Sequence, residues 1–206
     1  RYLSGVLRHN AVALGLELRS DGFVRLSEVL ALDFFQRRRV TEDYLLQLVA
    51  QNEKKRFGTC VPPGESEIFI RAHQGHTMRD IDDAALLRLV SNAAELPILC
   101  HGTFQTVWPA IQREGLRTMA RNHIHCVAKD LAAPEHAGVV HSGSRGECDV
   151  VIYIDAAAAM AEGVQFHWSQ NNVVLTRGID NVLPARMFVG ANVWNWETEE
   201  WEYDCL

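Results

Sequence analysis

Long apolar runs are missing from this sequence. No apolar stretch approaches the roughly 20 residues that a membrane-spanning helix needs, and the amphipathic first segment lacks the uninterrupted apolar stretch of a signal peptide. These absences predict an intracellular protein, cytoplasmic or nuclear, without membrane contact. Because the sequence opens on Arg1 rather than Met, we expect further residues to precede it.

Cysteine is scarce and irregularly placed. The five cysteines are odd in number and show no C-x-x-C spacing: Cys60, Cys100, Cys126, Cys148 and Cys205. Disulfide frameworks and zinc sites both need regular pairs. We therefore expect free thiols, mostly buried, and no bound metal.

Excess positive charge is also missing. The formal net charge is -6, whereas a general nucleic-acid binder usually presents a basic face. Residues 1–96 hold 13 basic and 13 acidic side chains, and residues 97–206 hold 7 and 13. If a nucleic acid binds, the first half is the better place for it.

The first half has the pattern of a winged helix. Helical spacing and capping signals predict three helices, over 3–14, from Ser27 and from Thr41, with a short extended piece at 23–26 between the first two. Two strands should follow, at Arg56–Phe57 and Glu67–Ala72, joined by a proline-glycine turn. Helices followed by a β-hairpin are typical of that fold.

The second half reads as richer in strands. The stretch from Thr77 to Glu95 is helix-compatible, and Pro97 closes it. Short apolar strands follow at 98–100, 124–127, 150–154 and 173–176, with helices at 106–114 and 155–161. A chain of 206 residues can form two compact lobes, so we predict an α+β protein with lobes at 1–96 and 97–206.

Two polar clusters in the first half could carry chemistry. Arg8-His9 falls in the middle of the first helix, although an exposed arginine beside a surface histidine would read the same way. Arg71 leaves an apolar strand and is followed by Ala72-His73-Gln74-Gly75-His76, where the glycine would let a ligand approach the backbone. A plain hairpin edge explains that order less well than a functional site does.

The second half offers three further candidates. His101-Gly102-Thr103 joins a strand to a helix start, a natural place for a nucleotide, or else holds a core histidine and a cap. His123 and His125 should project together from one strand, with Arg121 before them and no ligand spacing for a metal. Arg145 lies at a strand entrance, where a surface arginine would look the same.

Taken in order, these segments resemble the NAD-dependent RNA 2′-phosphotransferases that complete transfer-RNA splicing. The resemblance spans nearly the whole chain. It rests on the motifs Leu3-Ser4 to His9, Asp21 to Val24, Lys55 to Phe57, Arg71 to His76, His101 to Thr103, Gly115-Leu116, Arg121 to His125, Phe166 to Asn171 and Val174 to Thr176. Some positions depart from the family pattern: Asn172 stands where glycine is usual, His73 where asparagine is common, and Cys126-Val127 where Leu-Ser is common.

The resemblance implies a winged-helix lobe joined to an ADP-ribosyltransferase-like lobe. It implies four catalytic residues: Arg8, His9, Arg71 and Arg145. It implies an NAD site formed by Ala72, Gln74, Gly75, His76, His101, Gly102, Thr103, Arg121, His123, His125, Ser169 and Asn171, and RNA contacts from Lys54, Lys55 and Arg56. The expected partners are NAD, consumed as a co-substrate without a metal, and 2′-phosphorylated RNA, tRNA first of all, bound by a monomer.

The implied reaction moves the 2′-phosphate of a splice junction to NAD. Its products are nicotinamide, 2′-hydroxyl RNA and ADP-ribose 1″,2″-cyclic phosphate. Guanidinium groups suit this chemistry because they bind phosphate oxygens in pairs, so the three catalytic arginines should converge on the phosphate. Two other readings stay open: an ADP-ribosyltransferase that caps terminal phosphates of RNA or DNA, and a winged-helix module that only senses NAD or ADP-ribose.

Overall fold

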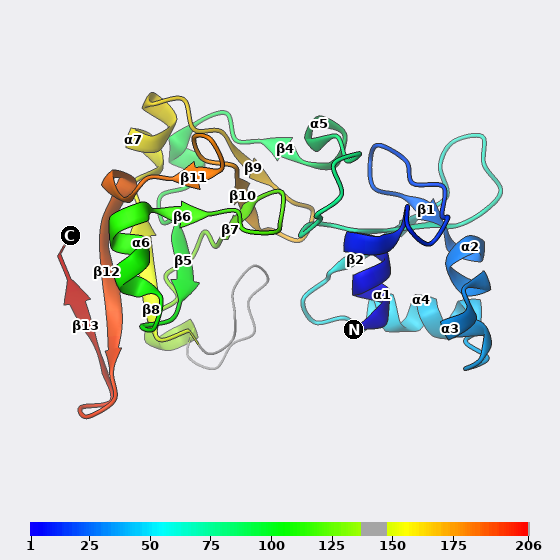
Figure 1. The fold of residues 1–206 in the computed structure, drawn as a ribbon, viewed down its shortest axis with the longest axis horizontal. Coiled ribbons are helices and arrows are strands. Elements are labelled where there is room, and N and C mark those ends of the chain that lie inside the picture. The colour runs from blue at the N-terminus through cyan, green and yellow to red at the C-terminus, as the bar shows by residue number, and fades with distance from the viewer. Residues whose placement is uncertain (137–147, 206) are drawn as a thin grey trace. The chain divides into compact units, whose positions relative to one another are not determined.

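The computed structural model describes residues 1–136 and 148–205, which form two compact units. Unit 1 comprises Arg1–Leu87 with Ala120–Asn122, and unit 2 comprises Arg88–Met119 with His123–Leu206. The chain thus leaves the first unit at Leu87, before the expected position 96, and returns to it for three residues. Helices and strands are mixed in both units, as an α+β sequence pattern predicts (Figure 1).

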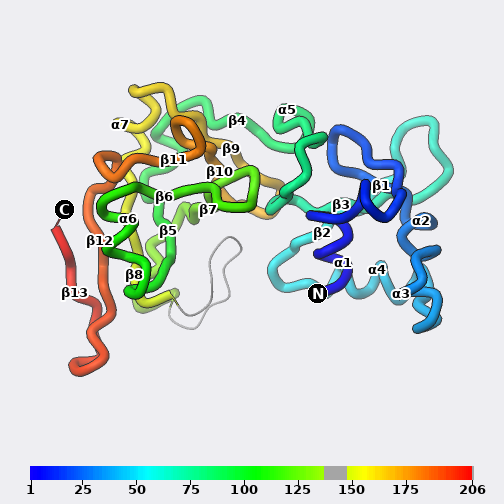
Figure 2. The backbone as a smooth tube through the Cα atoms, viewed as in Figure 1, coloured from blue at the N-terminus to red at the C-terminus, as the bar shows by residue number. Residues whose placement is uncertain are grey.

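Unit 1 places short helices around a small antiparallel sheet with the strand order β1-β3-β2. Its elements are α1 (Tyr2–Gly5), the π-helical turn η1 (Val6–Asn10), β1 (Val24–Arg25), α2 (Leu26–Ala31), α3 (Asp33–Gln36), α4 (Glu42–Ala50), β2 (Phe57–Cys60), β3 (Phe69–Ala72) and α5 (Asp83–Leu86). The predicted hairpin is confirmed: β2 and β3 pair from Phe57 opposite Ala72 to Cys60 opposite Phe69. Figure 2 traces this hairpin along the backbone.

Several helix predictions for unit 1 need correction at their ends. The first helix stops at Asn10 rather than Leu14, because its last turn widens to π geometry and the chain turns through Gly15. The helix expected at Ser27 begins at Leu26, and the Ser27 hydroxyl bonds Glu67 instead of capping it. The Thr41 start is confirmed, since the Thr41 hydroxyl accepts from the Tyr44 amide at 3.3 Å.

The long helix compatible with Thr77–Glu95 is wrong. Only α5 and a 3-10 turn, η2 (Ala93–Glu95), are helical there. Asp82 caps α5 through the Ala84 amide, and Leu87 at its other end is already extended. The chain crosses from one unit to the other at this point.

Unit 2 is built from antiparallel sheets with short helices. Its strands are β4 (Arg88–Leu89), β5 (Cys100–Thr103), β6 (Leu116–Arg117), β7 (Ile124–Cys126), β8 (Val150–Ile154), β9 (Phe166–Trp168), β10 (Val174–Thr176), β11 (Val182–Leu183), β12 (Phe188–Asn195) and β13 (Glu200–Asp204). They form sheets ordered β4-β9-β10-β7, β13-β12-β8-β5 and β11-β6. Its helical segments are η2, α6 (Trp108–Glu114), η3 (Pro134–His136), α7 (Ala156–Ala161) and η4 (Ala185–Met187).

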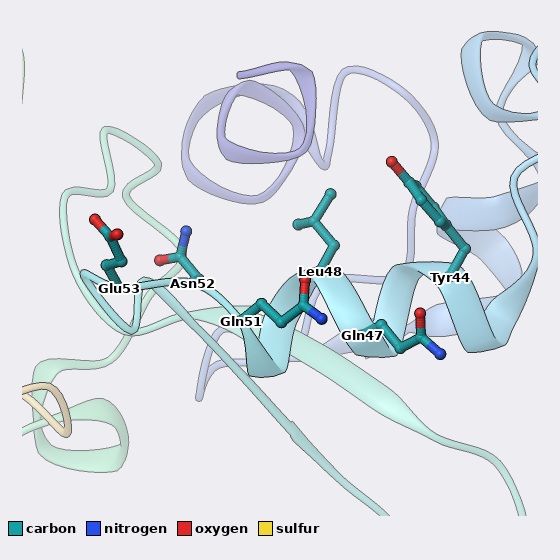
Figure 3. Close-up of a pocket in the computed structure, with 6 residues that line it drawn as sticks. All are labelled: Tyr44, Gln47, Leu48, Gln51, Asn52 and Glu53. Atoms are coloured by element: carbon teal, nitrogen blue, oxygen red, sulfur yellow. The ribbon is translucent and has the colours of Figure 1, made fainter.

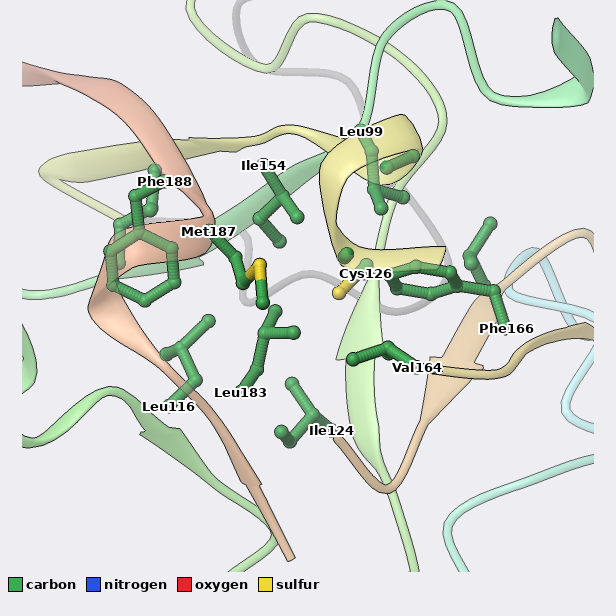
Figure 4. Packing of buried hydrophobic residues seen from close by; sticks show 14 of the residues in the cluster. Leu99, Leu116, Ile124, Cys126, Ile154, Val164, Phe166, Leu183, Met187 and Phe188 are labelled. Carbon is green, nitrogen blue, oxygen red and sulfur yellow. The ribbon is translucent and has the colours of Figure 1, made fainter. Parts of the chain in front are cut away.

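The core of unit 2 lies among these strands and α7. Phe166, Leu183 and Met187 are fully buried there, as Figure 4 shows. The predicted ends of both longer helices are confirmed: α6 stops at Gly115, which has a φ of 81°, and Asp155 caps α7 through the Ala158 amide. In the C-terminal strand β13, the Asp204 carboxylate accepts from the Trp108 indole at 3.1 Å.

The cysteines are free, as expected, but less buried than expected. Cys100 and Cys126 are buried, Cys60 and Cys148 are half-buried and Cys205 is exposed. Over the described residues, no helix is long and apolar enough to cross a membrane.

Candidate functional site

Arg8 and His9 lie on the π-helical turn η1. The turn is anchored by Val6 and Leu7, each 1% exposed, which leaves Arg8 and His9 on its other side. Single π-turns occur often at functional sites. The segment after β3 closes over the turn: the Thr77 amide donates to the Arg8 carbonyl at 3.0 Å, and the Thr77 hydroxyl lies 3.0 Å from His9 Nδ1.

The Arg8 guanidinium is buried and crowded by other positive charge. Its Nε and Nη2 atoms find no hydrogen-bond partner among the described residues. Burial first, then the charges of Arg121 and Arg56, lower the pKa of Arg8 from 12.5 to about 10. A cation kept in such surroundings is typical of a site that binds an anion.

Gly75 makes room for this guanidinium. It has a φ of +84°, a conformation that favours glycine. A methyl group at Gly75 would lie 3.3 Å from both Cζ and Nε of Arg8. The glycine of the R-A-x-Q-G-H motif therefore serves both the turn and the close approach of Arg8.

Contacts hold the Arg71 side chain on β3 but leave one of its guanidinium nitrogens without a hydrogen bond among the described residues. The side chain is only 5% exposed. Its Nη1 donates to the Asp21 carbonyl at 2.7 Å, and its Cζ lies 4.4 Å from the centre of the Phe23 ring. Its Nε has no partner among the described residues, and burial lowers the pKa of the group although Asp21 opposes this.

The Asp21-Gly22-Phe23 turn is thus a site element that residue patterns alone did not identify. The sequence pattern predicted only a turn followed by a short extended segment at these residues. The available signal was the D-G-F-V motif within the family resemblance, which gave no role to its aspartate or its phenylalanine. The structure shows that the turn supports Arg71 through a carbonyl and an aromatic face.

The residues after Arg71 are buried although they are polar. His73, Gln74 and His76 are 8%, 7% and 3% exposed. The His73 ring packs directly on Gly58, where any side chain would collide with it. Burial and then the charge of Arg71 lower the pKa of His73 to about 4, so this ring is neutral at physiological pH.

Arg121 belongs to unit 1, although its sequence position lies within the second predicted lobe. The Asn122 amide donates to the His76 carbonyl at 2.8 Å, and the Asn122 side chain donates to the Met78 carbonyl at 2.9 Å. These bonds hold the short segment 120–122 against the stretch that follows β3. Arg121 is there close enough to lower the pKa values of both Arg8 and His9.

The basic segment Lys54-Lys55-Arg56 lies in the same unit. The Asn52 carboxamide accepts from the Arg56 amide at 2.9 Å, and the Arg56 carbonyl accepts from the His73 amide at 2.9 Å. Desolvation and the Arg56 charge lower the pKa of Lys54. Unit 1 therefore brings together Arg8, Arg56 and Arg121.

In unit 2, the predicted histidines gather around β5 and β7. His101 Nδ1 lies 2.8 Å from the His125 carbonyl, and His125 Nδ1 lies 3.1 Å from the His123 carbonyl. Thr103 is 7% exposed and does not cap α6, whose N-cap residue is Val107 and which has no side-chain capping bond. The plain reading of Thr103 as a helix cap is therefore wrong.

Ser169 and Asn171 shape a tight turn between β9 and β10. The Ser169 hydroxyl bonds the Asn171 carboxamide oxygen at 2.9 Å and accepts from the Val173 amide at 3.0 Å. Asn172 has a φ of 58°, a conformation that asparagine tolerates better than most residues. The replacement of glycine by asparagine at this position is thus compatible with the turn.

Two further expectations concern Arg145 and the absence of a metal site. Arg145 lies outside the described residues. Over residues 1–136 and 148–205, no group of three or more histidine, cysteine, aspartate or glutamate side chains could hold a metal ion.

The sequence matches one family model from residue 1 to residue 178, described as RNA 2′-phosphotransferase, Tpt1 / KptA family. The chain belongs to this family. It is 40% identical over 186 residues to a putative tRNA 2′-phosphotransferase of Schizosaccharomyces pombe, covering 90% of the chain but 48% of that protein. The family resemblance drawn from the motifs is thereby confirmed.

Other relatives within the RNA 2′-phosphotransferase family are covered more fully. The chain is 41% identical over 177 residues to tRNA 2′-phosphotransferase 1 of Danio rerio, with 85% of the chain and 76% of that protein aligned. It is 33% identical over 195 residues to the tRNA 2′-phosphotransferase of Saccharomyces cerevisiae, with 93% of the chain and 83% of that protein aligned. The family match ends at residue 178, so β11, η4, β12 and β13 lie beyond the matched residues.

Proposed function

We propose that this chain removes the 2′-phosphate from spliced RNA, tRNA first of all, and transfers it to NAD. The observation that carries the proposal is a pair of arginines in unit 1, the half-buried Arg8 and the buried Arg71. Both keep guanidinium nitrogens without a partner among the described residues. An unsatisfied buried donor costs about 1–3 kcal/mol, and more when charged, so such groups persist where a ligand satisfies them.

A phosphate dianion is the ligand that suits these groups best. Guanidinium forks bind phosphate oxygens in pairs, and a buried charged contact is stronger than an exposed one. Arg121 and Arg56 add positive charge around Arg8. We assign Arg8, Arg71 and Arg121 to the phosphate, with Arg56 as a contact to the neighbouring RNA backbone, and we keep Arg145 as a catalytic candidate from the family resemblance.

His9 is placed to move a proton. Burial and the charges of Arg8 and Arg121 lower its pKa, so the ring is neutral near pH 7 and can accept a proton. The contact between His9 Nδ1 and the Thr77 hydroxyl orients the ring. In the proposed reaction His9 takes the proton from the hydroxyl group that displaces the RNA from the phosphorus.

NAD supplies the ribose that accepts the phosphate when it is bound. In unit 2 the buried residues Thr103, His123, His125, Ser169 and Asn171 would hold it, together with His101 and Gly102. Their hydroxyl, amide and imidazole groups are the donor and acceptor types that a dinucleotide needs.

We further propose that unit 1 is a winged-helix RNA lobe and unit 2 an ADP-ribosyltransferase-like lobe. The succession of α1, β1, the three helices α2, α3 and α4, and the β2-β3 hairpin supports the first assignment. Antiparallel sheets with a histidine on β5 and another on β7 support the second.

The test is turnover of a 2′-phosphorylated RNA oligonucleotide with NAD by the wild type and by Arg8→Ala and Arg71→Ala. We expect the wild type to release nicotinamide and 2′-hydroxyl RNA. Each variant should be slower by about 100-fold or more, the usual effect of removing a charge-stabilising contact. Near-normal turnover by both variants would refute the site.

A parallel reaction on a 5′-phosphorylated oligonucleotide separates the capping alternative. A stable ADP-ribosylated adduct with that substrate, and none of the cyclic product with the other, would establish a terminal-phosphate ADP-ribosyltransferase instead.

A further inference from the structure

Helix α4 exposes two large side chains on one face. Tyr44 and Leu48 are 58% and 38% exposed, whereas Leu45 is 1% exposed. Gln47 and Gln51 share the exposed face, because residues three and four apart are neighbours on a helix surface. Exposed apolar groups gathered among polar ones are typical of a binding surface.

This face borders a groove. The groove encloses about 470 Å³ and is lined by Tyr44, Gln47, Leu48, Gln51, Asn52 and Glu53. Figure 3 shows Tyr44 and Leu48 rising from the same side of α4, with Asn52 and Glu53 beyond the end of the helix. We call it the α4 groove.

The groove offers flat and amide surfaces but no positive charge. Its lining contains one aromatic ring, three carboxamides, one leucine and one carboxylate. A phosphate group would meet the Glu53 carboxylate and no cation there. A nucleobase fits better, because it stacks on a tyrosine ring and exchanges hydrogen bonds with amides along its edge.

The groove lies next in the chain to the basic segment Lys54-Lys55-Arg56, since its last lining residue is Glu53. Asn52, in its lining, accepts from the Arg56 amide at 2.9 Å. Lys54 and Lys55 lie between them in the sequence, and the Arg56 charge reaches both Lys54 and Arg8. Base-binding and phosphate-binding surfaces are therefore adjacent within unit 1, as a single-stranded nucleic acid requires.

We propose that the α4 groove is a subsite for an unpaired base of the RNA strand that carries the 2′-phosphate. Tyr44 stacks on the base, Gln47 and Gln51 contact its edge, and Lys54 and Arg56 follow the adjoining backbone. This inference rests on the proposed function, since it takes the 2′-phosphate at Arg8 as its reference point. It predicts that α4 gives this chain a preference for longer RNA.

The test compares two substrates that differ in length. One is a 2′-phosphorylated dinucleotide, which the proposal takes to leave the α4 groove empty, and the other is a single-stranded oligonucleotide with a central 2′-phosphate. For Tyr44→Ala we expect KM for the oligonucleotide to rise about ten-fold, the size of one lost base-aromatic stack. We expect kcat for the oligonucleotide, and both constants for the dinucleotide, to stay at wild-type values.

Two further variants control this result. Tyr44→Phe keeps the ring and should restore the wild-type KM. Tyr203→Ala makes the same substitution at a tyrosine of similar exposure, 55%, on β13 in unit 2, and should change neither substrate. Equal effects of Tyr44→Ala on both substrates, or no effect on either, would overturn the proposal.

Failure of the proposed function gives a separate signal. If the wild type turns over neither substrate, the groove can still be tested by measuring the affinity for a fluorescent single-stranded RNA without 2′-phosphate by anisotropy. A weaker affinity in Tyr44→Ala, with that of Tyr203→Ala unchanged, would support the subsite. An unchanged affinity for RNA in both variants would overturn the subsite, and the exposed face of α4 would then suit a protein partner instead.

Discussion

Replacing Arg8 with methionine should make the ligand-free protein more stable and less active. In the folded protein, burial and the charges of Arg121 and Arg56 lower the Arg8 pKa from 12.5 to about 10. A shift of one pKa unit corresponds to about 1.4 kcal/mol, so the charged group costs about 3 kcal/mol of folding free energy. Because the folded pKa lies below the unfolded one, this cost is complete at neutral pH and falls only as pH rises above about 10.

Methionine keeps most of the apolar stem of arginine and removes the charge. Some packing is lost, so we expect a net gain of about 1–2 kcal/mol, which raises Tm by about 2–8 °C for a chain of this size. The same variant should lose about 100-fold or more in kcat/KM, since the phosphate loses a charged contact. Thermal melting without ligand and turnover with NAD measure the two effects.

Arg186→Met is the matched control. Arg186 is exposed and pairs with Glu162 at 2.6 Å, and this pairing raises its pKa. Exposed ion pairs contribute little to stability, so Tm should fall slightly or stay unchanged, with full activity. An Arg8→Met protein that melts well below the wild type, or that turns over normally, would show that Arg8 is structural and refute the reasoning.

Three further outcomes follow from the site. Gly75→Ala should lower both Tm and kcat/KM, because the new methyl would lie 3.3 Å from Arg8 and the backbone there has a φ of +84°. The matched control is Gly163→Ala, which has a φ of +91° but no atom within 4 Å of the new methyl, so it should lower Tm alone. Wild-type stability should fall as pH drops from about 6.5 towards 4, because His73 takes up its proton at a higher pH in the unfolded chain than in the folded one. His73→Gln should flatten that part of the curve of Tm against pH, and an unchanged slope would contradict this role of His73. Turnover should persist in excess EDTA, because the proposed roles need only guanidinium and imidazole groups; loss of activity restored by a divalent cation would contradict them.

Much of the architecture was predictable because it is encoded locally. Thr41 caps α4 through a hydroxyl three residues away, and Gly115 ends α6 with a positive φ. Such signals depend on neighbouring residues. The short strands β6 and β11 were not predictable, because two residues show no period and their pairing depends on partners far along the chain.

The site shows the same division. The motifs around Arg8 and Arg71 marked both residues, but no spacing rule joins Arg121 to Arg8 across more than a hundred residues. That approach depends on Asn122 bonding the backbone of His76 and Met78. The exposure of Tyr44 was likewise hidden, because helical spacing identifies a face of α4 without saying where the face points.

The most direct test of the account follows the phosphate itself. An RNA with a radiolabelled 2′-phosphate, incubated with the wild-type protein and NAD, should lose its label to a product made from ADP-ribose, with one nicotinamide released for each phosphate moved. Label that stays on the RNA, or that appears as inorganic phosphate without release of nicotinamide, would contradict it.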